Sequence, residues 1–502
     1  MTYNEQAAIR KQCAYQLNAM EDINKNGDVY CTEDELFRSC THERRGLSFN
    51  RFRADKAQLM QAGFLHQEGQ HIYAQQTWEY EESAAKRISA LLESSVLSRH
   101  FTRETLCRGS VPLSEEQQSA VLMALNSPIS LILGGAGSGK TTLISAIART
   151  YGCFSRTVIA APTGKAARSL TERTGIPART VHGALGKMPD ENFLDPVRWM
   201  WTELVIIDEA SMMTLEMLAG ILNRAASNCR IVLLGGPNQL LSVGTGNVIP
   251  DLLALGIPCT RLARQYRQSD EAAALRRNVV EFPRLAGADE LAWDDSFRMT
   301  SAGNDEIAGL ICREAARRYL MGEDIQVLGL VNHGPDFSVK ALNFRIRDIV
   351  NPMTKRKATW KGLRDGDRVI VLKNDRERGI CNGDVGTLCI TGEKAVLLLS
   401  GHRRVSWDTE DPPRGLDLDL SYALTVHKSQ GSQYDTIFLP VSTATSRMLY
   451  RNLLYTAISR AKREVCLVGS QEAVSLAMQR MLRPRRSKLV AKTNLLRYRR
   501  SA

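Results

Sequence analysis

The octapeptide GGAGSGKT, at residues 134–141, decides the fold expected for this chain. It matches the pattern G-x-x-x-x-G-K-[ST] at every fixed position, an apolar run at 129–133 precedes it, and apolar residues at helical spacing follow at 143–147. This context predicts a strand, a glycine-rich loop and a helix, with backbone N–H groups that converge on phosphate oxygens. We therefore favour a nucleoside-triphosphate site over a glycine-rich turn that contains a lysine by chance.

The side chains of this loop have distinct expected roles. Lys140 is expected to reach the β- and γ-phosphates as a point charge, and the Thr141 hydroxyl to hold Mg²⁺. Glycines keep Cβ atoms away from the phosphate oxygens. The residues expected to bind the nucleotide here are Gly135, Ala136, Gly137, Ser138, Gly139, Lys140, Thr141 and Thr142.

A second motif, LVIIDEAS at residues 204–211, is an apolar strand that ends in two carboxylates. Such an ending is common and uninformative alone. Following a phosphate loop in the same chain, it predicts that Asp208 binds Mg²⁺ and that Glu209 polarises the attacking water.

Composition narrows the class of protein. The chain has 502 residues and a formal net charge of +12, and nine basic residues without an acidic one lie between Arg480 and Ala502. This tail predicts contact with a polyanion such as nucleic acid, although a solvated, frayed terminus is an equal alternative. No apolar run approaches ~20 residues, the N-terminus lacks a signal-peptide pattern, and the eleven cysteines form no C-x-x-C. A reducing cytoplasm is the expected compartment.

Short, continuous apolar runs separated by amphipathic stretches predict an α/β fold with parallel strands buried on both faces. The runs lie at 129–133, 158–161, 204–207, 231–234, 326–330, 436–441 and 464–468. We expect one α/β layer at 101–262 and a second at 263–349 and 414–480. Short strands and turn residues at 350–413 predict a small inserted β-barrel.

The two ends of the chain lack the pattern of apolar runs that predicts the α/β layers. Residues 1–100 are mostly helical and finish in an alternating stretch at 63–74, which predicts a winged-helix-like module. A structural helical platform is a nearly equal alternative. Residues 481–502 form the basic tail.

Further motifs occur in a recognisable order. They are LSEEQQSA at 113–120, APTGKAA at 161–167, TVH at 180–182, GGPNQLLSVG at 235–244, QYRQ at 265–268, TVHKSQGS at 425–432 and LYTAISRAK at 454–462. With the phosphate loop they resemble, over roughly 113–470, the motifs of superfamily 1 helicases, and within them the RecD-like branch that includes TraA-type helicases. The resemblance implies that the two α/β layers are RecA-like P-loop NTPase layers. The family's inserted SH3-like barrel and winged-helix-like N-terminal region match the expected organisation.

The resemblance implies a role for each motif. Gln117 would read adenine, and Gly431 would contact the nucleotide from the second layer. Arg267 and Arg460 would bring positive charge to the γ-phosphate, where charge grows in the transition state. Gln239 would sense that phosphate. With Lys140 and Glu209, these three side chains complete the expected catalytic set.

The resemblance also implies a groove for single-stranded DNA across both layers. Hydroxyl, amide and imidazole groups suit backbone phosphates, which carry no sequence information. The residues expected there are Pro162, Thr163, Thr180, His182, Asn332, Thr425 and His427.

One motif departs from the family pattern. The family usually has an acid where this chain has Gly236, and a proline where it has Leu241. Because the groups that bind and hydrolyse the nucleotide are intact, we expect the change to weaken coupling to DNA movement more than hydrolysis.

These features predict an ATP- and Mg²⁺-dependent DNA helicase that moves 5′-to-3′ on single-stranded DNA and acts at single-strand/duplex junctions. The first alternative is a DNA-stimulated ATPase or translocase that unwinds weakly within a larger nuclease, conjugation or defence complex. The second is an ATP-switched DNA-binding scaffold, against which the intact Glu209 argues.

Overall fold

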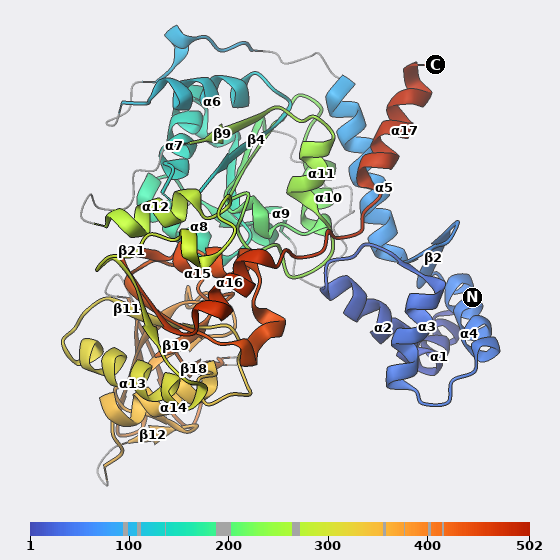
Figure 1. The fold of residues 1–502 in the computed structure, drawn as a ribbon. Coiled ribbons are helices and arrows are strands. Elements are labelled where there is room, and N and C mark those ends of the chain that lie inside the picture. Colours follow the sequence, from blue (N-terminus) through green and yellow to red (C-terminus); the bar gives the residue numbers. More distant parts are fainter. Residues whose placement is uncertain are drawn as a thin grey trace.

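Two parallel β-sheets form the centre of the molecule (Figure 1). The computed structural model describes residues 1–93, 99–107, 112–135, 137–186, 202–263, 272–354, 358–375, 377–399, 403–413 and 416–501. The first sheet has the order β6-β5-β7-β8-β4-β9, and all its pairings are parallel. Its strands are β4 (Ile129–Gly134), β5 (Thr157–Ala161), β6 (Arg179–Thr180), β7 (Leu204–Ile207), β8 (Arg230–Gly235) and β9 (Cys259–Leu262).

Helices connect these strands and bury their faces. They are α6 (Glu115–Leu125), α7 (Lys140–Tyr151), α8 (Gly164–Thr174), α9 (Val181–Leu185), α10 (Leu215–Arg224) and α11 (Val248–Ala254). Every residue of β4, β7 and β8 is buried, as expected for continuous apolar strands covered on both sides. We call this unit the first motor domain.

The second motor domain has the sheet order β10-β21-β20-β11-β19, again with parallel pairings throughout. Its strands are β10 (Phe297–Ser301), β11 (Ile325–Gly329), β19 (Ala423–Thr425), β20 (Tyr434–Val441) and β21 (Ala461–Gly469). Its helices are α12 (Ala273–Glu281), α13 (Asn304–Leu320), α14 (Val339–Val350), α15 (Arg451–Ile458) and α16 (Gln471–Gln479). All seven apolar runs identified in the sequence are therefore strands of these two sheets.

An antiparallel sheet interrupts the second motor domain between β11 and β19, with the order β17-β16-β15-β14-β18. Its strands are β14 (Arg368–Val371), β15 (Val385–Thr391), β16 (Lys394–Leu399), β17 (Arg404–Asp408) and β18 (Leu418–Leu420), and the short pair β12 (Thr359–Trp360) and β13 (Leu363–Arg364) precedes it. The insertion extends beyond the expected boundary at residue 413, because β18 pairs with β14.

The N-terminal domain combines four helices with a small antiparallel sheet of order β1-β3-β2. Its elements are α1 (Tyr3–Gln12), α2 (Ala14–Lys25), β1 (Cys31–Thr32), α3 (Glu33–Glu43), α4 (Phe49–Gln61), β2 (Leu65–Glu68) and β3 (His71–Ala74). Thr2 and Thr32 start α1 and α3 with capping boxes, in which side chain and backbone satisfy each other.

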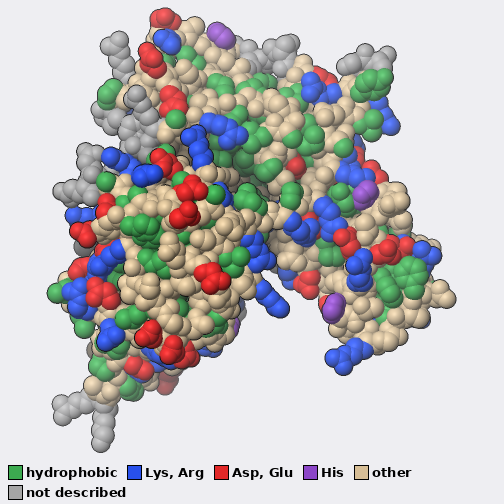
Figure 2. All heavy atoms as spheres, in the orientation of Figure 1, with side chains coloured by type: hydrophobic (Ala, Val, Ile, Leu, Met, Phe, Trp, Pro, Cys, Tyr) green, Lys and Arg blue, Asp and Glu red, His purple; other side chains and the backbone are tan. Residues whose placement is uncertain are grey.

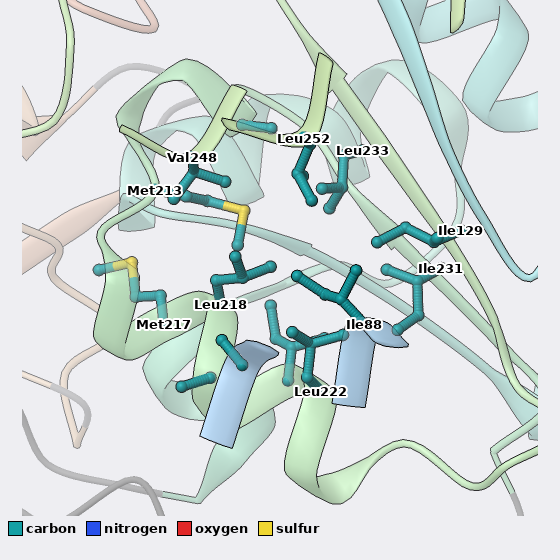
Figure 3. Packing of buried hydrophobic residues seen from close by; sticks show 14 of the residues in the cluster. Ile88, Ile129, Met213, Met217, Leu218, Leu222, Ile231, Leu233, Val248 and Leu252 are labelled. Atoms are coloured by element: carbon teal, nitrogen blue, oxygen red, sulfur yellow. The ribbon is translucent and has the colours of Figure 1, made fainter. Parts of the chain in front are cut away.

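The long helix α5 (Gln75–Glu93) joins the N-terminal domain to the first motor domain. Figure 3 shows its Ile88 among Leu218 and Leu222 of α10 and residues of the first sheet. Part of the predicted N-terminal unit, residues 1–100, thus belongs to the core of the first motor domain.

The C-terminal segment differs from the expected tail. Residues 480–488 run from α16 to α17 (Leu489–Ser501), which lies beside α5 (Figure 1). Its basic side chains pair with acids of the N-terminal region, which the local sequence did not reveal: Arg483 and Arg486 with Asp28, and Lys492 with Glu81. Among the described residues, no helix is both long and apolar enough to cross a membrane.

Candidate nucleotide and nucleic-acid site

The loop between β4 and α7 has the backbone conformation that its glycines permit. Gly137 and Gly139 both have φ of +83°, a left-handed conformation that glycine adopts without steric cost. The Lys140 Nζ donates to the carbonyl oxygens of Gly134 at 2.6 Å and Gly135 at 2.8 Å. Because α7 begins at Lys140, the N-terminal end of its dipole and the ammonium group lie together, an arrangement that favours phosphate.

The two carboxylates follow β7 at a strained turn. Glu209 has φ of +52°, which costs about 1–3 kcal/mol for a residue with a side chain and is typical of functional sites. Its backbone N–H donates to the Asp208 Oδ1 at 2.9 Å. Burial, followed by the charge of Glu209, raises the pKa of Asp208 to about 6, while Lys140 opposes the shift. A bound cation would stabilise the ionised form of Asp208.

These groups share one cavity of about 500 Å³, which both motor domains line. The first motor domain contributes Lys140, Thr141, Asp208, Glu209 and Gln239, and the second contributes Gly431 and Arg460. Gly137, Ser138, Gly139 and Thr142 also line it. The structure therefore brings together most of the predicted nucleotide-binding residues.

Arg460 follows α15 and is only 4% exposed. Its Nε donates to the Thr456 carbonyl oxygen at 3.2 Å, which fixes the direction of the guanidinium. Gly431 has φ of +76°, and a Cβ there would lie 3.7 Å from the Ala166 Cβ of α8. The second motor domain thus touches the first beside the cavity.

The loop that follows β8, residues 235–246, carries Gln239; we call it the sensor loop. The Gln239 Oε1 accepts from the Ser211 hydroxyl at 3.4 Å. Gly236, where the family usually has an acid, lies against Gln239. A Cβ at this position would lie only 2.7 Å from the Gln239 Cδ. Glycine at this position leaves room for the observed conformation of Gln239.

Sequence reasoning missed three polar lining residues, Ser169 and Arg173 of α8, and Gln433. Arg173 is close enough to Asp208 to lower the pKa of that carboxyl, against the effect of burial. The missed signal is helical spacing, because Ala166, Ser169 and Arg173 share one face of the helix that Thr163 starts.

Two of the described predicted residues, Gln117 and Gly135, do not line the cavity. The Gln117 Oε1 accepts from the Ser114 N–H at 3.1 Å in a capping box that starts α6. Ala136 and Arg267 lie outside the described residues.

The predicted nucleic-acid residues lie where parallel strands end. Pro162 and Thr163 follow β5, Thr180 ends β6 and precedes His182, Asn332 follows β11, and Thr425 ends β19 and precedes His427. Strands β5 and β6 are neighbours in one sheet, and β11 and β19 in the other. Each sheet therefore presents a pair of these loops at its carboxyl edge, where α/β sheets bind ligands.

Three of these hydroxyl groups already organise the backbone. Thr163, Thr180 and Thr425 accept hydrogen bonds from backbone N–H groups at 3.3, 2.9 and 3.2 Å. A hydroxyl that accepts in this way keeps its own hydrogen as a donor, which suits a phosphate oxygen. Burial lowers the pKa of His427, so its imidazole is neutral near pH 7.

The inserted sheet contacts the first motor domain next to Thr163. Arg168 of α8 donates through Nη1 to the Asp384 Oδ1 at 2.5 Å and through Nη2 to the Gly379 carbonyl oxygen at 2.7 Å. This contact connects α8, which lines the nucleotide cavity, to the insertion.

Comparison with known proteins agrees with this geometry. Residues 112–285 match a family described as AAA domain, and residues 420–468 match the UvrD-like helicase C-terminal domain. The RecBCD enzyme subunit RecD of Mycobacterium tuberculosis is 30% identical over 460 residues, which cover 82% of this chain and 78% of the relative. The chain belongs to the RecD-like helicase family.

Other relatives cover different shares of their own length. The ATP-dependent RecD2 DNA helicase of Deinococcus radiodurans is 33% identical over 390 residues, 75% of this chain. This RecD-like chain spans about half of that relative, 52%. A solved structure of Bacteroides Pif1 bound to single-stranded DNA has 19% identity and a TM-score of 0.47, and covers 78% of this chain and 97% of Pif1.

Proposed function

We propose that this RecD-like chain is an ATP-dependent DNA helicase that moves 5′-to-3′ along single-stranded DNA and opens duplex at a junction. The observation that carries the proposal is the cavity shared by the two motor domains. It contains a phosphate loop and two carboxylates from one domain and a buried arginine from the other. Hydrolysis at such a site depends on the relative position of the two domains, which connects chemistry to movement.

Each group has a role that its position supports. Lys140 binds the β- and γ-phosphates, and Glu209 orients the water that attacks the γ-phosphate. Arg460 stabilises the charge that develops during transfer. Arg267, for which we propose the same role from the sequence alone, lies outside the described residues. Gln239 contacts the γ-phosphate and transmits its presence through the sensor loop.

The donor set of the cavity fits Mg²⁺. Asp208 and Thr141 supply a carboxylate and a hydroxyl oxygen, and both line the cavity beside the phosphate loop. Mg²⁺ prefers oxygen ligands and is commonly held by one or two carboxylates together with substrate phosphates. No cluster of three or more His, Cys, Asp or Glu side chains suited to a metal ion occurs in the described ranges, which is compatible with such a site. When bound, the ion neutralises phosphate charge.

Single-stranded DNA would cross the carboxyl edges of both sheets. Thr163 and Thr180 would bind its phosphates from the first motor domain, and Asn332, Thr425 and His427 from the second. Thr163, which would bind DNA, caps the start of α8, and residues of α8 line the nucleotide cavity. One rigid helix would therefore connect the DNA to the nucleotide.

We also propose assignments for the two smaller units. The five-stranded insertion corresponds to an SH3-like barrel, since its strands follow a simple antiparallel order apart from β18. The helices and the β2–β3 hairpin of the N-terminal domain correspond to a winged-helix-like module. Both lie beside the motor domains (Figure 1), and we propose that they contact DNA near the single-strand/duplex junction.

The direct test is steady-state ATP hydrolysis with and without single-stranded DNA, using the parent chain and Glu209→Gln. We expect DNA to stimulate the parent, and the variant to bind ATP while its turnover falls by roughly a hundredfold. Equal rates in saturating DNA would contradict the role of Glu209, and a parent without turnover would contradict the proposed function.

A further inference from the structure

The sensor loop separates two cavities. On one side Gln239 faces the nucleotide cavity. On the other side, Gly236, Asn238 and Ser242 line a second cavity of about 420 Å³. Leu240 of this loop is buried in the core of the second motor domain, but the loop residues that line the two cavities have open space beside them. Specific contacts therefore add to packing in determining where Gln239 lies.

The part of this loop on both sides of Gln239 is held by the helix that precedes Arg460. The backbone N–H of Leu240 donates to the Thr456 Oγ1 at 3.0 Å, and the Asn452 Nδ2 donates to the Asn238 carbonyl oxygen at 3.2 Å. Both partners belong to α15 of the second motor domain. These contacts connect the sensor loop across the cleft.

The C-terminal end of the sensor loop is held by Arg485, which belongs to the segment between α16 and α17. Its Nη1 donates to the Ser242 hydroxyl at 2.8 Å and to the carbonyl oxygens of Gly244 at 3.1 Å and Gly246 at 3.0 Å, and its Nη2 donates to the Ser242 carbonyl oxygen. A single planar guanidinium thus fixes three residues of the loop, a geometry that the point charge of lysine does not reproduce.

The N-terminal domain closes this contact from the opposite side. The Gly27 carbonyl oxygen accepts from the Gly246 N–H at 2.9 Å, and a Cβ at Gly27 would lie 2.1 Å from the Arg485 Nε. The next residue, Arg486, pairs with the buried Asp28 at 3.0 Å, and its backbone N–H donates to the same carboxyl at 2.9 Å. The N-terminal domain, the C-terminal segment and the sensor loop therefore meet at one point.

Positively charged side chains lie around the point where these three parts meet. On the face seen in Figure 2, Lys and Arg side chains gather around the hollow between the N-terminal domain and the rest of the molecule. The C-terminal segment crosses between these parts in Figure 1. Because Gly27 and Asp28 contact this segment, a displacement of the N-terminal domain would act on Arg485 and, through it, on the sensor loop.

We propose that Arg485 is a positioning residue for Gln239, and that it makes ATP turnover depend on how the N-terminal domain is docked. The inference rests on the proposed function, because Gln239 is its γ-phosphate sensor. With Arg485 in place, the sensor loop is held both around Gln239 and at its C-terminal end, and Gln239 is presented to the γ-phosphate. When the N-terminal domain is pulled away, the loop gains the freedom that its flanking cavities allow, and turnover slows.

Arg485→Ala tests the positioning role in the full-length chain. We expect the DNA-stimulated kcat to fall about tenfold, as is typical of coupling between sites, while the KM for ATP changes less than about threefold. Arg485→Lys should recover only part of the loss. Arg480→Ala is the matched control and should keep the parent kcat, because the Arg480 side chain donates to the Ser446 carbonyl oxygen, within the second motor domain and away from the sensor loop.

Gly27→Ala tests the connection to the N-terminal domain from a distance. Its control is Gly63→Ala, in the same domain, because Gly63 has φ of +76° and nothing within 4 Å of a new Cβ, whereas Gly27 has φ of +98°. Both variants carry the strain of a left-handed alanine, and only Gly27→Ala displaces Arg485. We expect kcat to fall only for Gly27→Ala, with circular dichroism confirming that both variants fold.

The outcomes separate the inference from the proposed function. A parent that lacks DNA-stimulated hydrolysis would overturn the proposed function and, with it, this inference. An active parent whose Arg485→Ala variant keeps its kcat, or changes only its KM, would overturn the inference alone. Equal effects of Gly27→Ala and Gly63→Ala would overturn the connection to the N-terminal domain.

Discussion

Replacing Lys492 with methionine should leave a buried carboxylate without its cation. The Glu81 side chain is fully buried on α5, and the Lys492 Nζ of α17 lies 3.3 Å from its Oε2. The Oε1 accepts from the Ser487 hydroxyl at 3.1 Å and the Lys488 N–H at 2.7 Å. Burial raises the pKa of Glu81, and Lys492 provides the largest opposing effect.

The magnitude follows from the way in which this carboxyl avoids an unpaired charge. Without Lys492 it can take up a proton, and at pH 7 this costs about 3.7 kcal/mol for an ordinary pKa of about 4.3, since each pH unit is worth about 1.4 kcal/mol. We therefore expect Lys492→Met to destabilise the docking of α17 by about 3 kcal/mol at pH 7, within the usual range for breaking a buried pair.

The pH dependence has a definite sign. Burial already raises the folded-state pKa of Glu81 in the parent, and loss of Lys492 raises it further above the unfolded value. Folding of the variant therefore takes up a proton, and the variant loses stability relative to the parent as pH rises. The penalty should shrink by about 1.4 kcal/mol per unit toward pH 5 and be small near pH 4.

Hydrogen exchange of the α17 backbone amides measures this effect, with variant and parent compared at the same pH. We expect roughly hundredfold faster exchange at pH 7 for Lys492→Met, the amount that ~3 kcal/mol implies, and recovery when Glu81→Gln is added. Lys488→Met is the control, because its Nζ lies 3.9 Å from a partly exposed Glu68 and such pairs contribute little. Parent-like exchange at pH 7, or an effect that does not change with pH, would refute the reasoning.

Four further changes test the nucleotide site by steady-state ATP hydrolysis. Arg460→Ala should lower kcat by ~10³ with a smaller change in nucleotide affinity, because the charge of Arg460 is needed most in the transition state. We expect the same of Arg267→Ala. An unchanged kcat would remove the arginine concerned from the site. Arg173→Ala should raise the KM for ATP by about tenfold, since a charged hydrogen bond contributes about 1.5–3 kcal/mol; an unchanged KM would assign Arg173 to the protein surface. Gly236→Ala should slow turnover several-fold, because its Cβ would lie 2.7 Å from the Gln239 Cδ and must displace that side chain; a parent-like rate would show that Gln239 tolerates the shift.

The structure also changes the expectation for restoring the acid at position 236. Gly236→Asp adds the missing charge, and the sequence predicts more base pairs opened per ATP. The same change brings a Cβ against Gln239, which must first move. We therefore expect a gain in that ratio only if Gln239 finds a second position that still reaches the γ-phosphate.

Local patterns predicted the parts of the fold that depend on neighbouring residues. Continuous apolar runs identified the strands of both parallel sheets, because a strand buried on both faces has no polar alternation. The phosphate loop and the carboxylates after β7 were predictable for the same reason, since each motif positions its own side chains.

The C-terminal segment was not predictable in this way. A basic stretch without acids indicates a free tail when its partners are unknown, and these partners, Asp28, Glu35 and Glu81, lie more than 400 residues away in the chain. Arg485 was missed because three of its four hydrogen bonds to the sensor loop go to backbone carbonyl oxygens, which carry no sequence signal. Arg173 was missed because one helical arginine is ordinarily a surface residue.

The central claim, that this RecD-like chain uses ATP to move 5′-to-3′ along DNA, is tested most directly by strand separation on duplexes with a single-stranded tail. Two duplexes of equal sequence should carry either a 5′ or a 3′ tail, with ATP consumption measured in the same reactions and Glu209→Gln as the inactive control. We predict that the parent opens the 5′-tailed duplex and leaves the 3′-tailed duplex intact while both tails stimulate hydrolysis. Opening of the 3′-tailed duplex alone, or of either duplex by Glu209→Gln at the parent rate, would contradict the account.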